Sequence, residues 1–174
     1  MTQRLGIDDV RPRIDNGNLP VKAVVGEVIP VTALVWREGH EAIAATLNVW
    51  SDRSPETIAT STMTVDRFIQ DRVHGIFTPG TEGTWYYRVD AWSDPIATWR
   101  DAVEKKMAAG QDAAELANDL AHGSNLYARA GLALNGSASR TLLKAGVNLD
   151  DHTKDLEERV ELALSAQEIG RAHV

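Results

Sequence analysis

Cysteine is absent from the 174-residue sequence. The fold therefore owes nothing to disulfides, and a thiolate nucleophile or a thiolate zinc site is excluded. Basic clusters are also missing, since the longest is the pair Lys105-Lys106 and the net charge is -7. Because nucleic-acid binding needs a basic face that releases counterions, we expect no nucleic acid as a partner.

Long apolar runs are lacking as well. No apolar stretch approaches the roughly 20 residues that span a bilayer. The opening stretch, MTQRLGIDDVRPRID, has no apolar core of the kind that a signal peptide needs. We therefore expect no membrane partner, and the sequence predicts a soluble, cytoplasmic protein.

The composition changes along the chain near Pro95. All six prolines lie at or before Pro95 and all five tryptophans at or before Trp99, whereas 16 alanines follow Pro95 and 7 precede it. Aromatic and Pro-rich composition suits strands and turns, while Ala with scattered Leu and Glu suits helices. The change predicts a β domain over residues 1–94 and a helical domain over residues 95–167.

The first part contains short apolar stretches, separated by turn signals at intervals of about 8 to 14 residues. The stretches expected to form strands are Val21–Val25, 28–36, Ile43–Val49, Thr57–Met63, Val73–Phe77 and Thr84–Trp92. Several short strands with this spacing favour an immunoglobulin-like β-sandwich. In the last strand, alternation puts four residues on each face: Trp85, Tyr87, Val89 and Ala91 on one, and Tyr86, Arg88, Asp90 and Trp92 on the other.

A helix is expected directly after this strand. Asp94 is a good N-cap, and Pro95 can occupy the first helical position, where its missing N–H costs nothing. The helix is expected to run to about Ala109, with Gly110 as its C-terminal stop.

Three further helices are expected after Gly110. Asp112 and Glu115 have the spacing of a capping box, which opens the second helix. The third is expected over Ser139–Lys144 and the fourth over Asp151–Ala166, where apolar residues repeat at every fourth position. Together these helices predict an α-helical bundle, so the fold class is α+β by segments.

Residues suited to metal binding or catalysis are scattered. The five histidines are His40, His74, His122, His152 and His173, and no two have the HxxxH or HExxH spacing of a zinc site. The motifs GxSxG, GxxxxGK[ST] and GxGxxG are absent. We therefore assign no catalytic, metal-binding or cofactor-binding residue, leave the substrate-binding residues unassigned, and expect no cofactor.

Two pairs of carboxylates, Asp8-Asp9 and Asp150-Asp151, are adjacent in sequence. The first lies in a strand-like stretch, where neighbours point to opposite faces, and the second has the pattern of a helix N-terminus. A glycosidase needs two carboxyl groups that converge across a cleft. We therefore interpret both pairs as solvated or capping charges.

Aromatic residues near the end of the first part allow two interpretations. Trp85, Tyr86, Tyr87 and Trp92 could form an exposed platform on which sugar rings stack. Alternation directs half of them toward the sandwich core, and packing in the core or between domains is the other interpretation. The sequence leaves both open.

Five short motifs follow one another in a specific order. They are Ile7-Asp8-Asp9-Val10-Arg11-Pro12, the run from Gly17 to Glu27, Gly39-His40 with Ala44-Ala45, Ala91-Trp92-Ser93-Asp94 with Thr98-Trp99, and the run from Lys105 to Asp112. In this order and spacing they resemble the N-terminal region of the bacterial α-1,4-glucan:maltose-1-phosphate maltosyltransferases, of the α-amylase clan. The resemblance covers roughly residues 4 to 120.

The resemblance implies a β-sandwich followed by the start of an inserted helical domain, both associated with homodimer assembly. It implies an enzyme that transfers maltosyl units from maltose 1-phosphate to α-1,4-glucans. The family's aspartate nucleophile and glutamate acid/base lie in a (β/α)8 barrel, which needs roughly 250 further residues. No catalytic residue can be carried onto this chain, which alone is expected to be inactive, and both substrates would bind to the missing barrel.

A different class of function is a freestanding carbohydrate-binding or protein-interaction module. In that case the β-sandwich would itself bind the ligand, and no barrel would be needed. The sequence leaves this alternative open beside the enzyme.

The ending from Glu168 to Val174 looks foreign to the rest of the chain. The codons ATC GGA AGA GCA CAC GTC would encode Ile169 to Val174, and they are the read-through of a widely used sequencing adapter. We therefore predict adapter read-through at 168–174 and a helical domain that is truncated near Gln167, which leaves the bundle incomplete. A natural polar C-terminus is the alternative.

Overall fold

A computed structural model describes residues 5–165 of the chain. The chain divides into two compact units, Met1–Ser93 and Asp94–Val174, which we call the strand unit and the helical unit. The predicted adapter segment at 168–174, and the end of the predicted fourth helix at Ala166, lie outside the described residues.

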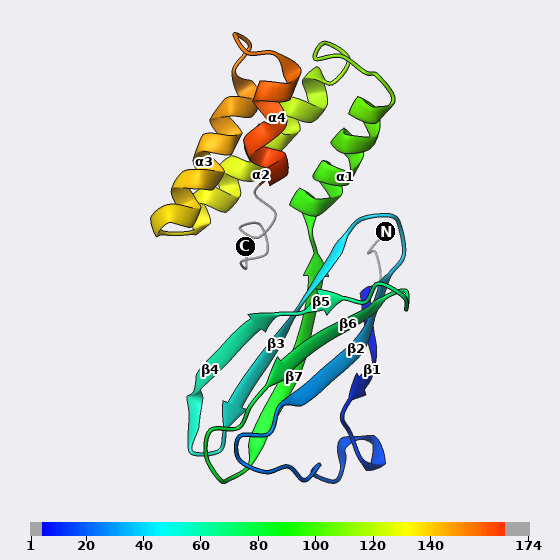
Figure 1. The fold of residues 1–174 in the computed structure, drawn as a ribbon, viewed down its shortest axis with the longest axis vertical. Coiled ribbons are helices and arrows are strands. Elements are labelled where there is room, and N and C mark those ends of the chain that lie inside the picture. Colours follow the sequence, from blue (N-terminus) through cyan, green and yellow to red (C-terminus); the bar gives the residue numbers. More distant parts are fainter. Residues whose placement is uncertain (1–4, 166–174) are drawn as a thin grey trace. The chain divides into compact units, whose positions relative to one another are not determined.

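The described part of the strand unit forms two antiparallel sheets (Figure 1). One sheet has the order β1 (Leu5–Arg11), β2 (Ile29–Arg37), β6 (Arg72–Phe77) and β5 (Thr64–Val65). The other has the order β4 (Ser54–Thr62), β3 (Ile43–Ser51) and β7 (Trp85–Ser93). A short 3-10 helix at Asp15–Gly17 follows β1.

The predicted strand at Val21–Val25 is wrong, because this segment forms no strand. Its apolar side chains stay in solvent, with Val24 69% exposed and Val25 50% exposed. The carboxylate of Glu27 accepts a hydrogen bond from Val24 N at 2.9 Å, within a turn at Gly26. The free edge of β2 pairs instead with β1, which contains the strand-like stretch around Asp8-Asp9.

The core of the strand unit combines apolar residues from both sheets. Its buried members are Val31, Ala33, Val35, Ala45, Leu47, Val49, Met63, Val73 and Val89. The side chains of Trp85, Tyr87 and Ala91 pack against this cluster. The alternation predicted for β7 is therefore confirmed, because the face with Val89 is the one that meets the core.

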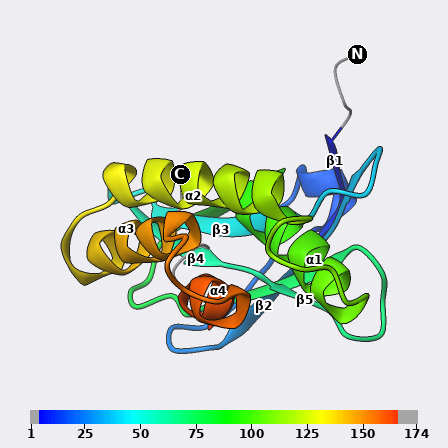
Figure 2. The same cartoon turned by 90° about the horizontal axis from the view of Figure 1, so that it is seen from above.

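The described helical unit contains α1 (Pro95–Ala108), α2 (Ala117–Ala133), α3 (Gly136–Asp150) and α4 (Leu156–Ser165). Helices α2 and α3 lie side by side (Figure 2). The core of the helical unit includes Trp99, whose ring meets that of Tyr127 edge-on, with 5.7 Å between the ring centroids. Within residues 5–165, no helix has the length and apolar character needed to cross a membrane. With the two sheets, these helices make the fold a mixed α+β class.

The predicted start and stop signals of the first helix are confirmed, and the predicted capping box forms in the turn that precedes α2, which itself begins at Ala117. Asp94 Oδ1 accepts a hydrogen bond from Ala97 N at 2.8 Å, which caps α1, and Gly110 follows α1 with a φ of +84°. Before α2, Asp112 N donates to Glu115 Oε2 and Glu115 N donates to Asp112 Oδ1, both at 2.9 Å. These reciprocal bonds are those of a capping box.

The later helices differ from the sequence prediction in their limits. Helix α3 extends beyond the predicted Ser139–Lys144 in both directions and ends at Asp150. The prediction that Asp150-Asp151 begins a helix is wrong, because Asp151 follows α3 as its C-terminal neighbour. The cap of α4 is Asp155, whose Oδ1 accepts a hydrogen bond from Glu158 N at 2.9 Å.

Two buried polar side chains connect α4 to the rest of the helical unit. Tyr127 OH donates to the carbonyl of Ala163 at 2.5 Å, and burial raises the pKa of Tyr127 to about 12. Arg159, only 4% exposed, donates from Nε and Nη2 to the carbonyl of Leu149 at 3.1 and 2.6 Å. Leu149 lies in the last turn of α3, where the helix dipole favours a cation.

Candidate functional site

The face of the β4-β3-β7 sheet that lies opposite the core carries two stacked aromatic rings. Trp50 of β3 lies directly opposite Tyr86 of β7 in the strand register. Their ring centroids are 5.8 Å apart and their planes are within 17° of parallel. Both rings point away from the core because Leu47, Val49 and Val89 occupy the other face of these strands. Tyr86 is 47% exposed, so solvent reaches the ring pair.

A row of hydrogen-bonded polar side chains lies beside the two rings. Thr60 Oγ1 donates to Asn48 Oδ1 at 2.7 Å, and Asn48 Nδ2 donates to Asp90 Oδ2 at 2.9 Å. Arg88 Nε and Nη2 donate to the two oxygens of Asp90, each at 2.7 Å. The hydrogen bonds and charge of Asp90 raise the pKa of Arg88. We call the six residues of this surface the aromatic–polar face: Trp50, Tyr86, Asn48, Thr60, Arg88 and Asp90.

The aromatic platform proposed from the sequence is only partly correct. Trp85 and Tyr87 pack against the core, and they therefore belong to the alternative interpretation. Tyr86 points away from the core, as does Trp92 by alternation, but the ring stacked on Tyr86 is Trp50. The sequence analysis missed Trp50, although its alternation with Leu47 and Val49 is a signal that could have found it.

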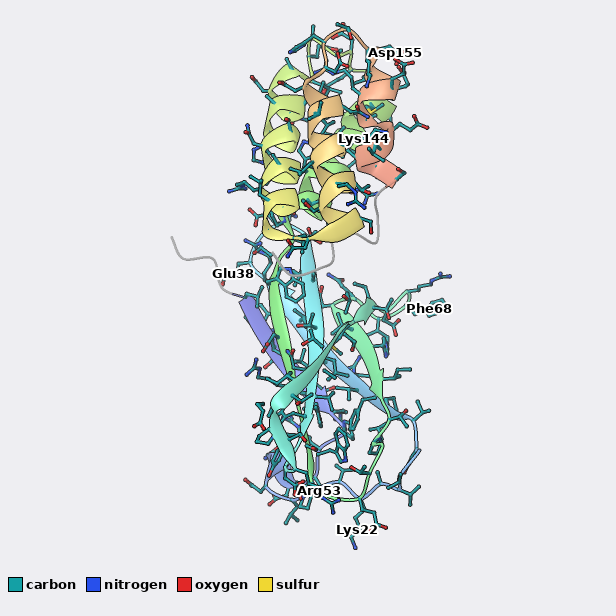
Figure 3. All side chains as sticks on the ribbon, turned by 90° about the vertical axis from the view of Figure 1, so that its left-hand side faces the viewer. Lys22, Glu38, Arg53, Phe68, Lys144 and Asp155 are labelled. Atoms are coloured by element: carbon teal, nitrogen blue, oxygen red, sulfur yellow. The ribbon has the colours of Figure 1, made fainter. Side chains whose placement is uncertain are left out.

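A second feature is the loop between β5 and β6, which holds Phe68 in solvent. Asp66 Oδ1 accepts hydrogen bonds from Phe68 N at 2.7 Å and Ile69 N at 2.9 Å. Asp66 Oδ2 lies 2.5 Å from His74 Nε2. These contacts, the two backbone bonds first, lower the pKa of Asp66 to about 2. Phe68 is 95% exposed and projects from the strand unit (Figure 3).

The lowered pKa of Asp66 predicts an acid-induced opening of this loop. Because the folded-state pKa of about 2 is below the usual 3.8, ionised Asp66 stabilises the loop at higher pH. That stabilisation is fully present above about pH 4 and is lost as the pH falls through 2. The amide NMR signals of Phe68 and Ile69 should therefore follow a titration near pH 2. If the signals of these amides instead titrated with a midpoint at pH 3.8, their hydrogen bonds would not be what lowers the pKa of Asp66.

A matched pair of variants tests the same loop at neutral pH. Asp66→Asn removes the charge that strengthens both backbone hydrogen bonds, so we expect hydrogen exchange at Phe68 N and Ile69 N to become about tenfold faster. Asp71→Asn is the control, because Asp71 holds the loop through its backbone carbonyl, which accepts from Val35 N at 2.7 Å. Equal effects of the two substitutions would show that the Asp66 carboxylate is not the cause.

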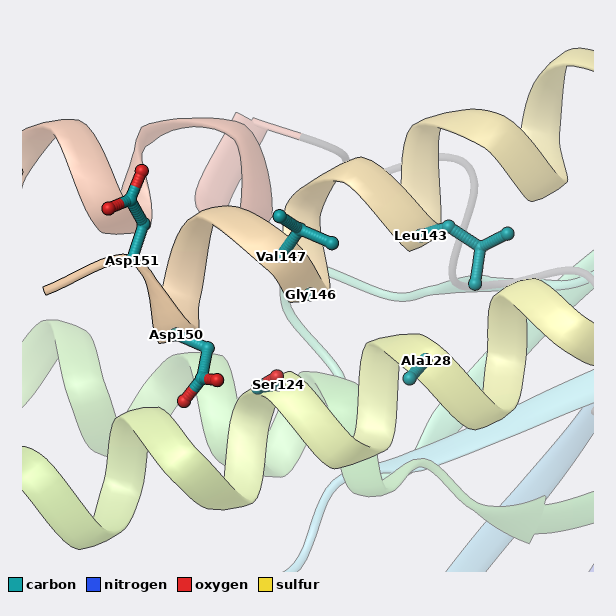
Figure 4. A pocket seen from close by; sticks show the side chains of 7 residues that line it. All are labelled: Ser124, Ala128, Leu143, Gly146, Val147, Asp150 and Asp151. Atoms are coloured by element: carbon teal, nitrogen blue, oxygen red, sulfur yellow. The ribbon is translucent and has the colours of Figure 1, made fainter.

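A groove of about 410 Å³ lies between α2 and α3 (Figure 4). Its lining residues are Ser124, Ala128, Leu143, Gly146, Val147, Asp150 and Asp151. The two carboxylates lie toward one end, and the remaining lining is small or apolar. The groove therefore lacks a convergent set of polar groups that could orient a substrate.

The first carboxylate pair takes part in structural contacts. Asp8 Oδ2 accepts a hydrogen bond from Trp36 Nε1 at 2.6 Å. Asp9 contacts Arg72 at 3.0 Å and Arg11 at 2.8 Å. The hydrogen bonds from these two guanidinium groups, Arg72 first, lower the pKa of Asp9. Asp9 therefore lacks the environment of a general acid, which requires a raised pKa.

The histidines of residues 5–165 join no candidate metal site. Among residues 5–165, no group of three or more His, Asp or Glu side chains could hold a metal ion. His74 contacts Asp66 as described above, and His173 lies outside the described residues. No catalytic constellation is therefore assembled by the histidines that the structure describes.

Comparison with protein families decides what kind of chain carries this surface. The model of α-1,4-glucan:maltose-1-phosphate maltosyltransferase, domain N/S, matches residues 3–173. The chain belongs to the maltosyltransferase domain N/S family. The resemblance inferred from the ordered motifs is thereby confirmed, and the match extends well beyond the roughly 120 residues that the motifs covered.

Several curated maltosyltransferases are similar to this domain N/S chain. The protein from Corynebacterium pseudotuberculosis is 48% identical over 167 residues, which are 96% of this chain and 24% of that protein. The protein from Corynebacterium glutamicum is 54% identical over 136 residues, 75% of this chain and 20% of its own length. The protein from Mycolicibacterium smegmatis is 42% identical over 171 residues, which cover 84% of this chain and 24% of that protein. The chain thus spans about a quarter of the length of these relatives.

Proposed function

We propose that this chain is the N-terminal, non-catalytic region of a cytoplasmic maltosyltransferase. The whole enzyme would transfer maltosyl units from maltose 1-phosphate to α-1,4-glucans by double displacement at a carboxylate of a (β/α)8 barrel outside this chain. The observation that carries the proposal is the match over residues 3–173 to a named part of such enzymes. The relatives are several times longer, which leaves room for the barrel.

The strand unit would act as a scaffold of the immunoglobulin-like type. Its sheet orders, β1-β2-β6-β5 and β4-β3-β7, correspond to the A-B-E-D and C′-C-F orders of that fold. Among the described strands, β7 pairs on one side only, with β3. A return strand after the helical unit could pair with the other edge, which agrees with an inserted helical domain.

The helical unit would contribute to homodimer assembly of the whole enzyme. Leu132 is 77% exposed and Val147 is 69% exposed on α2 and α3. Both side chains are open to solvent and would be available to a second copy of the enzyme. The alternative of a freestanding carbohydrate-binding or protein-interaction module is not favoured, because the same region occurs within longer maltosyltransferases.

A chimera tests the proposed function. Residues 5–165 would replace the matching segment of the Corynebacterium pseudotuberculosis relative, and maltosyl transfer from maltose 1-phosphate would be measured. We expect the chimera to keep most of the relative's activity, whereas the relative without the segment loses it. The 174-residue chain alone should show no transfer. Activity of the chain alone, or a chimera no better than the shortened relative, would reject the proposal.

A further inference from the structure

Two Asn-Gly dipeptides occur in the sequence, Asn16-Gly17 and Asn135-Gly136. An asparagine that precedes glycine can lose its side-chain amide without an enzyme, because glycine has no side chain that shields its backbone nitrogen. We propose that Asn135 is a modification site of this kind, at which deamidation converts the residue before α3 into aspartate and isoaspartate. Asn16 has the same neighbour, and its local structure protects it. The inference does not depend on the proposed function.

The reaction needs only these two residues and water. The backbone nitrogen of Gly136, after losing its proton, attacks Cγ of Asn135. The new C–N bond closes a five-membered succinimide ring, and the side-chain nitrogen takes up a proton and leaves as ammonia. Water then adds to one of the two ring carbonyls and breaks its bond to the ring nitrogen. One product is aspartate, and the other is isoaspartate, in which the main chain runs through the side-chain carbonyl and gains one CH2 group.

The backbone at Asn135 leaves this attack open. Ring closure requires the nitrogen of Gly136 to turn toward Cβ of Asn135 about the Cα–C bond, and the ψ of 164° already puts the two atoms gauche. Asn135 is the N-cap of α3, yet within the described residues its side chain makes no cap hydrogen bond, and both residues are exposed. As the first residue of α3, Gly136 has an N–H without an intrahelical acceptor, and this end of the helix favours the negative charge of the attacking nitrogen.

The same dipeptide at Asn16 is held in an unreactive arrangement. Asn16 has a φ of 54° and a ψ of 25°, which place the nitrogen of Gly17 nearly opposite Cβ of Asn16. Gly17 N also donates to the carbonyl of Ile14 at 2.9 Å. The next amide, Asn18 N, donates to the carbonyl of Asp15 at 3.0 Å. These bonds close a short turn that must open before the ring can form, which should slow the reaction about tenfold.

The turn between α2 and α3 gives the modification a structural effect. Ser139 Oγ donates to the carbonyl of Gly131 at 2.7 Å across this turn. A Cβ at Gly131 would lie 2.7 Å from Leu143 Cγ, so the two helices are in close contact here. Isoaspartate at Asn135 lengthens the backbone and shifts one side of this contact against the other, whereas aspartate keeps the backbone and adds a charge that suits an N-cap. The isoaspartate form should therefore loosen the helical unit.

Incubation of the folded 174-residue chain at mildly alkaline pH, followed by trypsin digestion and mass spectrometry, tests the inference. Asn135 is the only asparagine of the tryptic peptide 130–140, and fragmentation separates Asn16 from Asn18 in the peptide 14–22. We expect the gain of about 1 Da that marks deamidation to appear about tenfold faster at Asn135 than at Asn16. In denaturing urea the two sites should react at similar rates, because only the folded structure distinguishes them.

A second measurement tests the effect on the helices. Chain aged until Asn135 is largely isoaspartate, as resolved by chromatography of the peptide 130–140, should unfold at a lower urea concentration than fresh chain. Freshly prepared Asn135→Asp is the matched control, because it carries the new charge without the added CH2 group. We expect this variant to unfold no earlier than fresh wild type.

Each outcome decides the inference. Conversion at Asn16 that is as fast as at Asn135 in the folded chain would overturn it. An Asn135 that stays intact in the folded chain, while the denatured chain converts, would overturn it as well. If Asn135→Asp lost as much stability as the aged chain, the charge and not the lengthened backbone would be responsible, and the effect argued for the α2–α3 contact would be wrong.

Discussion

Gly123→Val is expected to lower the free energy of unfolding of the helical unit by about 3 kcal/mol. A Cβ atom at Gly123 would lie 2.4 Å from two ring atoms of Trp99, which is far inside contact distance. Trp99 cannot move away easily, because it is 4% exposed and donates from Nε1 to the carbonyl of Asp119 at 2.6 Å. The substitution therefore forces either the ring or the helix out of its packed position.

Urea unfolding followed by far-ultraviolet circular dichroism measures the effect. Ala121→Val is the matched control, because it puts the same residue at an exposed position of α2, where we expect a loss of less than about 1 kcal/mol. In a Trp99→Phe background the smaller ring should relieve part of the clash, so that the Gly123→Val penalty falls by about 1 kcal/mol. Equal penalties at the two helix positions would refute the packing argument.

The glycines of α2 and α3 show which part of the fold the sequence could not predict. Gly146 lies inside α3, and glycine costs a helix interior about 1 kcal/mol relative to alanine. This is consistent with a sequence prediction that stopped the third helix at Lys144. The structure keeps Gly146 in the helix because a Cβ there would lie 3.0 Å from the carbonyl oxygen of Ser124 on α2. Close approach of two helices is a tertiary requirement that a local pattern does not contain.

The start and stop signals around α1 and α2 were predictable because their chemistry is local. The Asp94 side chain accepts a hydrogen bond from the backbone N–H three residues ahead of it, and Asp112 and Glu115 bond to each other's backbone. The failure at Asp150-Asp151 has the same origin, since an aspartate at an N-cap is locally equivalent to one that follows a helix. The structure distinguishes the two roles, because the cap of α4 is Asp155, whereas Asp151 follows the end of α3.

Only the part of the aromatic–polar face that lies on β7 was predicted from the sequence. Alternation in β7 correctly put Tyr86 and Arg88 on the face opposite Val89, and the structure shows that the Val89 face is the one that meets the core. Alternation along β3 could also have put Trp50 on the face away from Leu47 and Val49. Its contact with Tyr86 required the partner strand and its register, because the two residues are distant in sequence and meet only through β3–β7 pairing. Register depends on the burial of a whole strand, so it could not be obtained from either segment alone.

Leu47→Ala is expected to destabilise the strand unit by about 3 kcal/mol. Leu47 is fully buried on β3, the central strand of its sheet, among core residues from both sheets. Truncation removes the apolar contacts of its outer carbons and leaves a cavity that the two sheets cannot fill without moving. Ile58→Ala is the control, because Ile58 is 52% exposed and its loss should cost less than about 1 kcal/mol.

A second substitution at Gly75 should partly compensate Leu47→Ala. A Cβ at Gly75 would lie 3.1 Å from Leu47 Cδ2 and 3.3 Å from Leu47 Cβ, both tight in the wild type, and the closer of these two contacts is absent once Leu47 is alanine. Gly75→Ala should therefore destabilise the wild type, yet restore about 1 kcal/mol in the Leu47→Ala background. Urea unfolding of the two single variants and the double variant measures this coupling. Additive losses in the double variant would show that the methyl group at Gly75 does not enter the space left by Leu47.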